Sequence, residues 1–265
     1  MKNGFLSLVI LTSLVFLVVP VVHAQYFKFD TATNAQQIED EVDAILKFFG
    51  SVVGGGMFHT ADLHSVGGLD VGLSGVLAKV PEDSENLPVF SEENLVGLGF
   101  LHGSLGLPGN FELFGRFFYF PLGSSVDSSA VPIRAFDSRG GVTLIGGGLK
   151  YGLVQMPGLP RLMVMGAYHA LFVPAEFDFG TVGTLSFKGV ASYSIPLFTI
   201  YAGVGIDFTS LKLKVKYLNG KRFTEAEPHL TLGAKVSILP LVHINGSYNI
   251  SEFSSFDLGI GISFR

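Results

Sequence analysis

The sequence has no cysteine and no tryptophan, and it contains few charged residues. The absence of cysteine excludes a disulfide framework, a thiol nucleophile, cysteine-based zinc sites and a lipid anchor on cysteine. Charged residues make up 15% of the 265-residue chain, against about 25% in ordinary soluble domains. A water-covered surface of normal polarity is therefore hard to build from this composition. The formal net charge of −5 argues against nucleic-acid binding, which needs a basic surface.

The long apolar run of the chain lies at its N-terminus. Lys2 precedes the run Phe5–Val22, and Val22-His23-Ala24 provides a cleavage site after Ala24. This pattern predicts a signal peptide over residues 1–24, and therefore export from the cytoplasm. An uncleaved membrane anchor is the alternative, because the run is just long enough to span a bilayer. Pro20 and the Val-x-Ala site favour cleavage.

A single apolar stripe predicts an amphipathic helix over residues 33–49. The stripe comprises Ile38, Val42, Ile45, Leu46 and Phe49, at the spacing of one helix face. The acidic residues between them are predicted to form a solvated face, and Gly50 is predicted to end the helix. Residues 25–65, this helix and a Gly-rich link, are expected to cap or plug the periplasmic mouth of the barrel predicted below, because the stripe needs a surface to cover.

Beyond residue 66, apolar and polar residues alternate with a period of two. In the segment 255–264 the even positions are apolar and most odd positions are small or polar, and 184–194, 229–238 and 242–250 alternate similarly. Such alternation predicts strands with one apolar and one polar face. Ten strands are predicted, at 67–80, 94–105, 110–120, 141–153, 161–173, 181–194, 197–217, 227–238, 241–250 and 255–264.

The seventh predicted strand changes the parity of its apolar residues. Ile206 and Phe208 share one face, whereas Leu211 and Leu213 fall on the other. A β-bulge near Thr209 is the predicted cause, since one extra residue restores the alternation.

The predicted connections differ in length on the two sides of the strands. Short, Pro-rich turns follow every second strand, and mostly longer, polar loops follow the others. This arrangement is typical of outer-membrane barrels, so residues 66–265 are predicted to form an all-β, ten-stranded antiparallel transmembrane β-barrel. A soluble barrel of lipocalin type is the alternative. The polar face carries few charges, which fits a confined lumen and favours the membrane barrel.

Eight charged residues are predicted to face the lumen. They are Asp70, Glu112, Arg116, Lys150, Lys188, Asp207, Lys235 and Asp257. Four acids and four bases balance, and buried charges must be paired. A neutralising network is therefore favoured over an ion-selective ring.

Signatures of catalysis and of established metal sites are absent from the sequence. The spacing His59-x-x-Asp62-x-His64 matches no known metal site, so a polar link is the preferred interpretation. No nucleophile elbow, His-Glu-x-x-His or phosphate loop occurs, and no cofactor or metal is predicted. Lumen histidines His169, His229 and His243 are interpreted as hydrogen-bonded. Loop acids, which would serve a surface hydrolase, are interpreted as a solvated loop that bridges cations on lipopolysaccharide; they are Glu82, Asp83, Glu85, Glu92 and Glu93.

Three stretches resemble an uncharacterised family of Gram-negative outer-membrane β-barrels. They are GGGMFHTADLHSVGGLDVGLSGVLAKVP (54–81), GLPGNFELFGRFFYF (106–120) and GGGLKYGL (146–153). The resemblance implies an outer-membrane barrel with an N-terminal helix and carries over no catalytic residue. A looser similarity to long-chain fatty-acid transport channels rests on the segment ahead of the barrel, although their Asn-Pro-Ala-Gly run is missing.

These observations predict a non-enzymatic protein of the Gram-negative outer membrane. Its expected role is a structural barrel or a narrow conduit for small or apolar solutes. A fatty-acid-type hydrophobic transporter and an outer-membrane hydrolase are the alternatives. Expected partners are outer-membrane lipid, lipopolysaccharide, a small apolar ligand and the barrel-assembly machinery, whose aromatic C-terminal signal the ending at Phe264 resembles.

Overall fold

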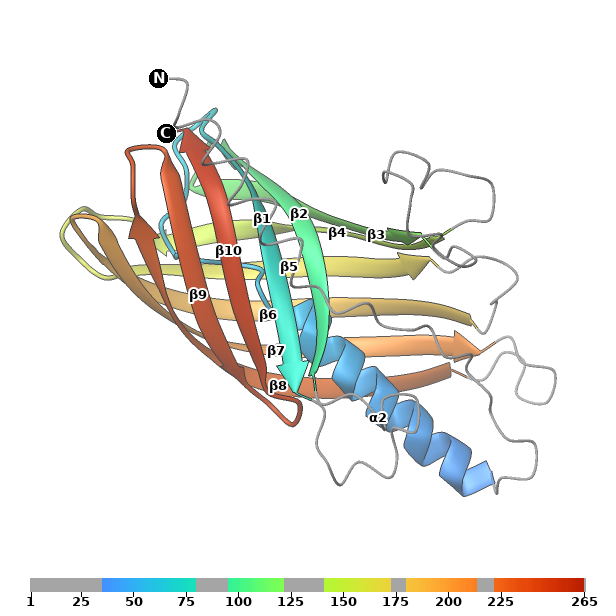
Figure 1. The fold of residues 1–265 in the computed structure, drawn as a ribbon. Helices are drawn as coiled ribbons and strands as arrows, with labels where there is room; N and C mark the ends of the chain where they lie inside the picture. Colours follow the sequence, from blue (N-terminus) through green and yellow to red (C-terminus); the bar gives the residue numbers. More distant parts are fainter. Residues whose placement is uncertain (1–34, 80–94, 122–140, 173–179, 214–221, 265) are drawn as a thin grey trace.

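Within the described residues, ten antiparallel strands form a closed barrel in the computed structural model of the chain (Figure 1). The structure describes residues 35–79, 95–121, 141–172, 180–213 and 222–264. The strands are β1 (Leu69–Lys79), β2 (Leu95–Leu107), β3 (Phe111–Pro121), β4 (Gly141–Val154), β5 (Arg161–Phe172), β6 (Gly180–Ile195), β7 (Phe198–Leu213), β8 (Arg222–Ser237), β9 (Val242–Ile250) and β10 (Ser255–Phe264). The predicted all-β, ten-stranded antiparallel fold is confirmed.

Pairing of the first strand with the last closes the barrel. Leu69 lies opposite Phe264, and the register continues without a break to Ala78 opposite Ser255. Every other strand pairs with its neighbours in the sequence. Because the sheet closes on itself, no edge strand is left with unpaired backbone groups, which is a requirement for a sheet inside a membrane.

The outer face of the wall is apolar, and the inner face is polar. Large apolar side chains from all ten strands are exposed on the outside, for example Leu101 at 50% and Leu258 at 61%. Within the described strands, the charged side chains that are fully exposed on this face are Lys79, Lys212 and Arg222, each at a strand end. A wall of this kind faces acyl chains, as in a transmembrane barrel.

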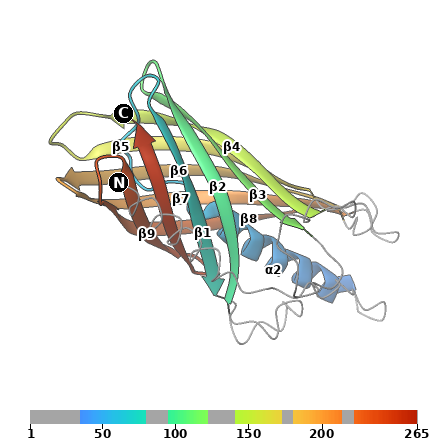
Figure 2. The same ribbon diagram turned by 45° about the horizontal axis from the view of Figure 1, so that its top comes forward.

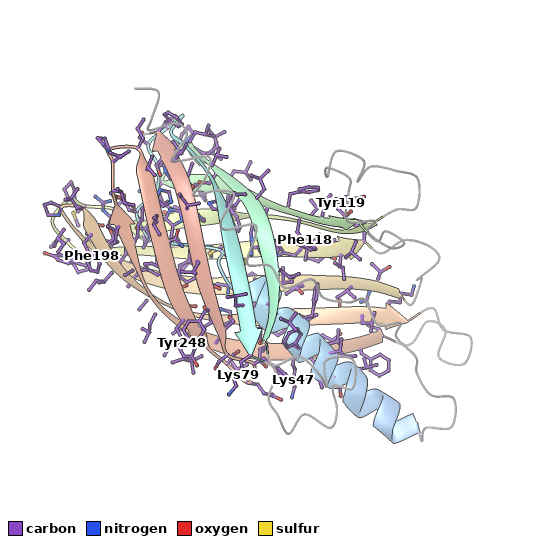
Figure 3. All side chains as sticks on the ribbon, viewed as in Figure 1. Lys47, Lys79, Phe118, Tyr119, Phe198 and Tyr248 are labelled. Carbon is purple, nitrogen blue, oxygen red and sulfur yellow. The ribbon has the colours of Figure 1, made fainter. Side chains whose placement is uncertain are left out.

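Aromatic pairs lie near both ends of the outer face. The rings of Phe111 and Tyr151 are 4.8 Å apart, and those of Tyr248 and Phe256 are 4.6 Å apart. Figure 3 shows side chains along the outside of the wall, with Phe198 and Tyr248 toward opposite ends of the barrel. Aromatic residues at these levels are typical of the two membrane–water interfaces.

The two ends of the barrel differ in their connections. At one end, here called the turn end, residues 108–110, 155–160, 196–197 and 238–241 join strands, and β1 begins and β10 ends there. At the other, the loop end, residues 80–94, 122–140, 173–179, 214–221 and 251–254 join strands. The segment 251–254 is as short as the turns and departs from the general difference.

The helix α2 (Ala35–Gly54) lies at the loop end and enters the lumen there (Figures 1 and 2). Val42 and Leu46, both 1% exposed, pack against β6, β7 and β8. Phe48, Val52 and Val53 pack against β1, β2 and Phe253. No helix among the described residues is long and apolar enough to cross a membrane.

The predicted end of this helix is wrong. It continues four residues past Gly50, because Gly50 is a packing position: a Cβ there would lie 2.9 Å from Thr209 Oγ1. The helix itself lies at the loop end, and the residues after it lead toward the turn end. Lys47 and Ser51 contact Glu252 and Ser251, in the connection between β9 and β10.

The predicted β-bulge near Thr209 is also wrong. The pairing of β7 with β6 and with β8 runs through Thr209 without a shift in register. Leu211 is apolar and faces inward because it packs against α2 near the loop end. The parity change therefore marks the point where the lumen becomes apolar. A register shift occurs instead in β4, between Gly152 and Val154.

The start of β8 differs from its prediction as well. This strand begins at Arg222 rather than at residue 227, and Pro228 pairs within it opposite Ile206. The predicted signal peptide and the loop acids Glu82, Asp83, Glu85, Glu92 and Glu93 lie outside the described residues.

A charge introduced on the outer face tests the membrane-facing assignment. Leu101→Arg places a guanidinium at the middle of β2, and we expect it to lower the free energy of unfolding in lipid by about 2–4 kcal/mol. Leu239→Arg, in a turn, is the matched control and should cost less than about 1 kcal/mol. Denaturant titration of the refolded barrels in lipid bilayers measures both. Equal costs would contradict a membrane-facing wall.

Candidate functional site in the barrel lumen

Residues 55–65, here called the threaded segment, continue from α2 through the lumen to the turn end. Near the loop end, Ser51 Oγ lies 3.2 Å from Ser251 Oγ. At the turn end, Leu63 N donates to Gln155 Oε1 at 3.1 Å. Just beyond the segment, Gly67 N donates to Gly106 O at 3.0 Å, and the chain then enters β1. The segment therefore runs along the lumen from one end toward the other.

The backbone N–H groups along this path donate hydrogen bonds to side chains of the wall. Gly56 N donates to Asp257 Oδ2 at 2.7 Å, Ala61 N to Ser192 Oγ at 3.0 Å, and His64 N to Glu112 Oε2 at 2.9 Å. These acceptors come from β10, β6 and β3. Because most of the segment is neither helix nor strand, the wall provides partners that secondary structure supplies elsewhere.

Three consecutive glycines allow a close approach between the end of α2 and the wall. A Cβ on Gly54 would lie 2.0 Å from Asp207 Oδ2, and one on Gly55 would lie 2.8 Å from Asp257 Oδ1. Gly56 has a φ of 60°, in the region that favours glycine. A side chain at Gly54 would therefore displace either the segment or the Asp207 carboxylate.

All eight charged residues that were predicted to face the lumen are buried on the inner face of the barrel wall. Their exposed fractions are 0% for Asp70 and Asp207, 2% for Glu112 and Asp257, 3% for Arg116, 4% for Lys188, 5% for Lys235 and 7% for Lys150. They come from β1, β3, β4, β6, β7, β8 and β10. The wall thus distributes them around the lumen rather than in one cluster.

One group of these charges joins β3 to β4 and to the threaded segment. Lys150 Nζ donates to Glu112 Oε1 at 2.8 Å. The other carboxylate oxygen of Glu112 lies 2.8 Å from His64 Nδ1 and also accepts from the His64 backbone. Glu112 therefore binds a wall cation and the threaded segment at the same time.

A second group surrounds the end of α2. Asp207 Oδ2 lies 3.7 Å from Lys188 Nζ and 2.9 Å from His229 Nδ1. Lys188 Nζ also contacts His229 Nε2 and donates to Gly54 O. The lysine thus binds the helix C-terminus, where exposed carbonyl groups favour a cation.

Two further charges contact the chain inside the lumen directly. Arg116 Nη1 donates to Val53 O at 3.0 Å, and its guanidinium lies 3.9 Å from the centre of the Phe100 ring. Asp257 Oδ2 accepts from Gly56 N, Ser247 Oγ and Asn249 Nδ2. The prediction has these charges pair within the wall, whereas Glu112 and Asp257 also bind the threaded segment and Lys188 and Arg116 bind the end of α2.

The histidines assemble differently from their spacing in the sequence. Asp62 lies away from His59 and pairs with Arg161. His59 lies beside wall histidines, with ring centres 4.5 Å from His243 and 6.3 Å from His102. His102 was missed in the sequence, although its even position in a predicted strand places it on the inner face.

Asp70 lies at the centre of this group of histidines. Its Oδ1 is 3.4 Å from His102 Nε2, and its Oδ2 is 3.8 Å from His243 Nε2 and 4.0 Å from His64 Nε2. Ser263 Oγ also donates to this carboxylate. His169, 1% exposed, lies outside this group and makes no hydrogen bond to the described residues.

At the loop end an exposed ion pair holds α2. Lys47 Nζ lies 3.1 Å from Glu252 Oε2, with side-chain exposures of 30% and 55%. This hydrogen bond raises the pKa of Lys47 above its ordinary value, and partial burial opposes the rise. Glu252 N in turn donates to Glu227 Oε1 at 2.8 Å, which links the connection to β8.

The sequence family accounts for most of the barrel. The family described as "Family of unknown function (DUF6588)" matches residues 86–264, more than half of the chain. The chain belongs to DUF6588. This confirms the resemblance to an uncharacterised barrel family, whereas these comparisons do not show the similarity to fatty-acid channels. Among curated proteins, none matches the sequence significantly.

Solved structures that resemble this DUF6588 chain are membrane barrels. A de novo designed transmembrane β-barrel is 12% identical, with a TM-score of 0.31 over 76% of this chain and 98% of its own. Ail of Yersinia pestis is 12% identical, with a TM-score of 0.33 over 75% of this chain and 99% of its own. A loop-deletion mutant of OmpT of Vibrio cholerae is 15% identical, with a TM-score of 0.34 over 72% and 58%. The values are low, and the fold assignment rests on the strand topology itself.

The Glu112–Lys150 pair provides a test of charge pairing in the lumen. We expect Glu112→Gln to lower the free energy of unfolding by about 3–5 kcal/mol, because it leaves the Lys150 ammonium buried without its partner. Glu112→Gln with Lys150→Met should recover part of this loss, since both charges are then absent.

The exposed pair at the loop end is the matched control for this cycle. Glu252→Gln should cost less than about 1 kcal/mol, because solvent screens the attraction to Lys47. Denaturant titration in detergent micelles measures all variants. A double variant less stable than Glu112→Gln alone would show that the buried cation does not cause the loss.

Proposed function

We propose that the protein is a non-enzymatic barrel of the Gram-negative outer membrane whose lumen is closed by its own N-terminal segment. Its role is then structural in the closed state, and any passage of small solutes requires displacement of the threaded segment. The observation that carries this proposal is the set of hydrogen bonds from wall side chains to the backbone of residues 53–64.

Packing along the lumen supports closure. α2 contributes two apolar clusters near the loop end. Below them, Met57, Phe58 and Ala61 of the threaded segment pack with Phe114, Met163 and Tyr201 of the wall. The rings of Phe58 and Tyr201 lie edge to face with centres 5.8 Å apart. An apolar filling of this kind opposes the entry of ions and water.

The wall itself favours a closed barrel over a fatty-acid-type channel, which would open laterally near glycine interruptions. Gly103, Gly115 and Gly147 are direct neighbours on the outer faces of β2, β3 and β4. The strand pairing continues through all three positions without a register shift. These glycines therefore thin the wall without interrupting it.

The rims of the barrel support an outer-membrane environment. The exposed cations Lys79, Lys212 and Arg222 lie at the loop end, and Lys212 pairs directly with Arg222 across the strands. Such cations fit the phosphate groups of lipopolysaccharide in the outer leaflet. In outer-membrane barrels the short turns face the periplasm, so the loop end would face outward.

Conductance across planar bilayers tests closure. We expect the refolded full chain to give no steady ionic current. Gly54→Val should produce channel openings, because its side chain collides with Asp207 and displaces the segment. Gly99→Val is the matched control and should stay silent, since a Cβ at Gly99 meets no atom within 4 Å. Steady current through the unsubstituted chain would overturn the proposal.

Cysteine labelling tests location and orientation, and the absence of native cysteine removes the background. Glu252→Cys at the loop end should react with a membrane-impermeant maleimide on intact cells. Leu239→Cys at the turn end should react only after the outer membrane is permeabilised. The reverse pattern would place the loop end in the periplasm, and labelling of neither variant after permeabilisation would argue against the outer membrane.

A further inference from the structure

The histidine group around Asp70 has donor atoms close enough to bind one metal ion. One ligand atom each from His59, Asp70 and His102 lies within 4.8 Å of the others. His59 belongs to the threaded segment, Asp70 to β1 and His102 to β2. Two imidazoles and a carboxylate form a ligand set that is common in sites for divalent transition metals.

Ring nitrogens in this group have no hydrogen-bond partner among the described residues. His59 Nε2, His64 Nε2 and His102 Nδ1 are buried and make no hydrogen bond there. His102 Nε2 and His243 Nε2 are also buried without a hydrogen bond, and they lie 3.4 Å and 3.8 Å from the Asp70 carboxylate. Buried polar atoms are normally paired, because an unpaired one has lost its hydration without gaining a partner. Several such atoms directed at one carboxylate indicate a common ligand.

A small cavity adjoins these residues. It has a volume of about 20 Å³, and its lining includes His59, Asp70 and His102. Arg116 and Lys150 also line it, and these two cations donate hydrogen bonds to Val53 O and Glu112 Oε1. A cavity of about 10–15 Å³ already admits one water-sized particle. The space beside the three ligands is therefore sufficient for a single ion.

We propose that His59, Asp70 and His102 bind one divalent transition-metal ion of the zinc type in the lumen. His243 lies beside this group, with its Nε2 3.8 Å from Asp70 Oδ2. In a tetrahedral zinc site the donor atoms are about 3.3 Å apart, so small side-chain rotations bring this group to the required geometry.

Bound metal would tie the threaded segment to the wall. His59 is the ligand from the segment, and the other two ligands come from β1 and β2. The chain has no cysteine and hence no disulfide to make such a link. The metal site does not depend on the proposed function, because it requires only the described geometry of the lumen.

Zinc titration of the refolded, tag-free full chain in detergent micelles tests the site. We expect calorimetry to show one Zn²⁺ per chain, and His59→Gln and His102→Gln to weaken binding by at least about 100-fold. His169→Gln is the matched control: this histidine is buried in the lumen but lies outside the group, and its loss should leave the affinity unchanged. Mg²⁺, which prefers oxygen ligands, should not compete.

Two further measurements keep the proposal open to refutation. Heat-modifiable gel mobility shows whether each variant folds, so that lost binding is not mistaken for misfolding. X-ray absorption of the zinc complex of the unsubstituted chain should show at least two imidazole ligands. Absence of saturable binding, an equal loss of affinity in His169→Gln, or one imidazole or none at the zinc would each overturn the proposal.

Discussion

The structure depends on one constraint: an irregular backbone inside a closed wall must find its hydrogen bonds in that wall. Arg116 and Glu112 of β3, Ser192 of β6 and Asp257 of β10 supply them to residues of α2 and the threaded segment. Irregular backbone at membrane depth is tolerated where protein surrounds it. The polar inner face is thus explained by the chain that it encloses, and the apolar outer face by the lipid that it meets.

Much of the fold follows from alternation, because a half-buried strand repeats every two residues whatever lies inside the barrel. Ten strands, the short turns and the closing strand 255–264 were predicted on this basis. The rule fails at Leu211, where the lumen is apolar because α2 fills it. A separate rule, that glycine ends a helix, fails at Gly50, because this residue packs against Thr209 within α2. Both errors arise from the packing of α2 against β7, a tertiary contact that a local sequence pattern does not reveal.

For the lumen residues, a local sequence pattern likewise predicts which side chains face inward but not which of them come into contact. Parity places Asp70 and His243 on the inner face, but only the register between strands determines which inward residues meet. Asp70 pairs with Ser263 in the register of β1 with β10, and His243 pairs with Gly261 in that of β9 with β10. The contact of His59 with this group depends further on the path of the threaded segment. Sequence spacing alone links His59 to Asp62, which the structure pairs with Arg161 instead.

Closure of the lumen and stability of the wall are consequently one property. If α2 and the threaded segment left the lumen, Arg116 would lose Val53 O and Asp257 would lose Gly56 N, and water would have to replace both partners. Glu112 would keep Lys150 but lose two bonds to His64. Buried charges tolerate such losses poorly, because desolvation is no longer offset by their partners. A barrel built in this way stays closed unless water or another ligand takes over the positions of its own N-terminal segment.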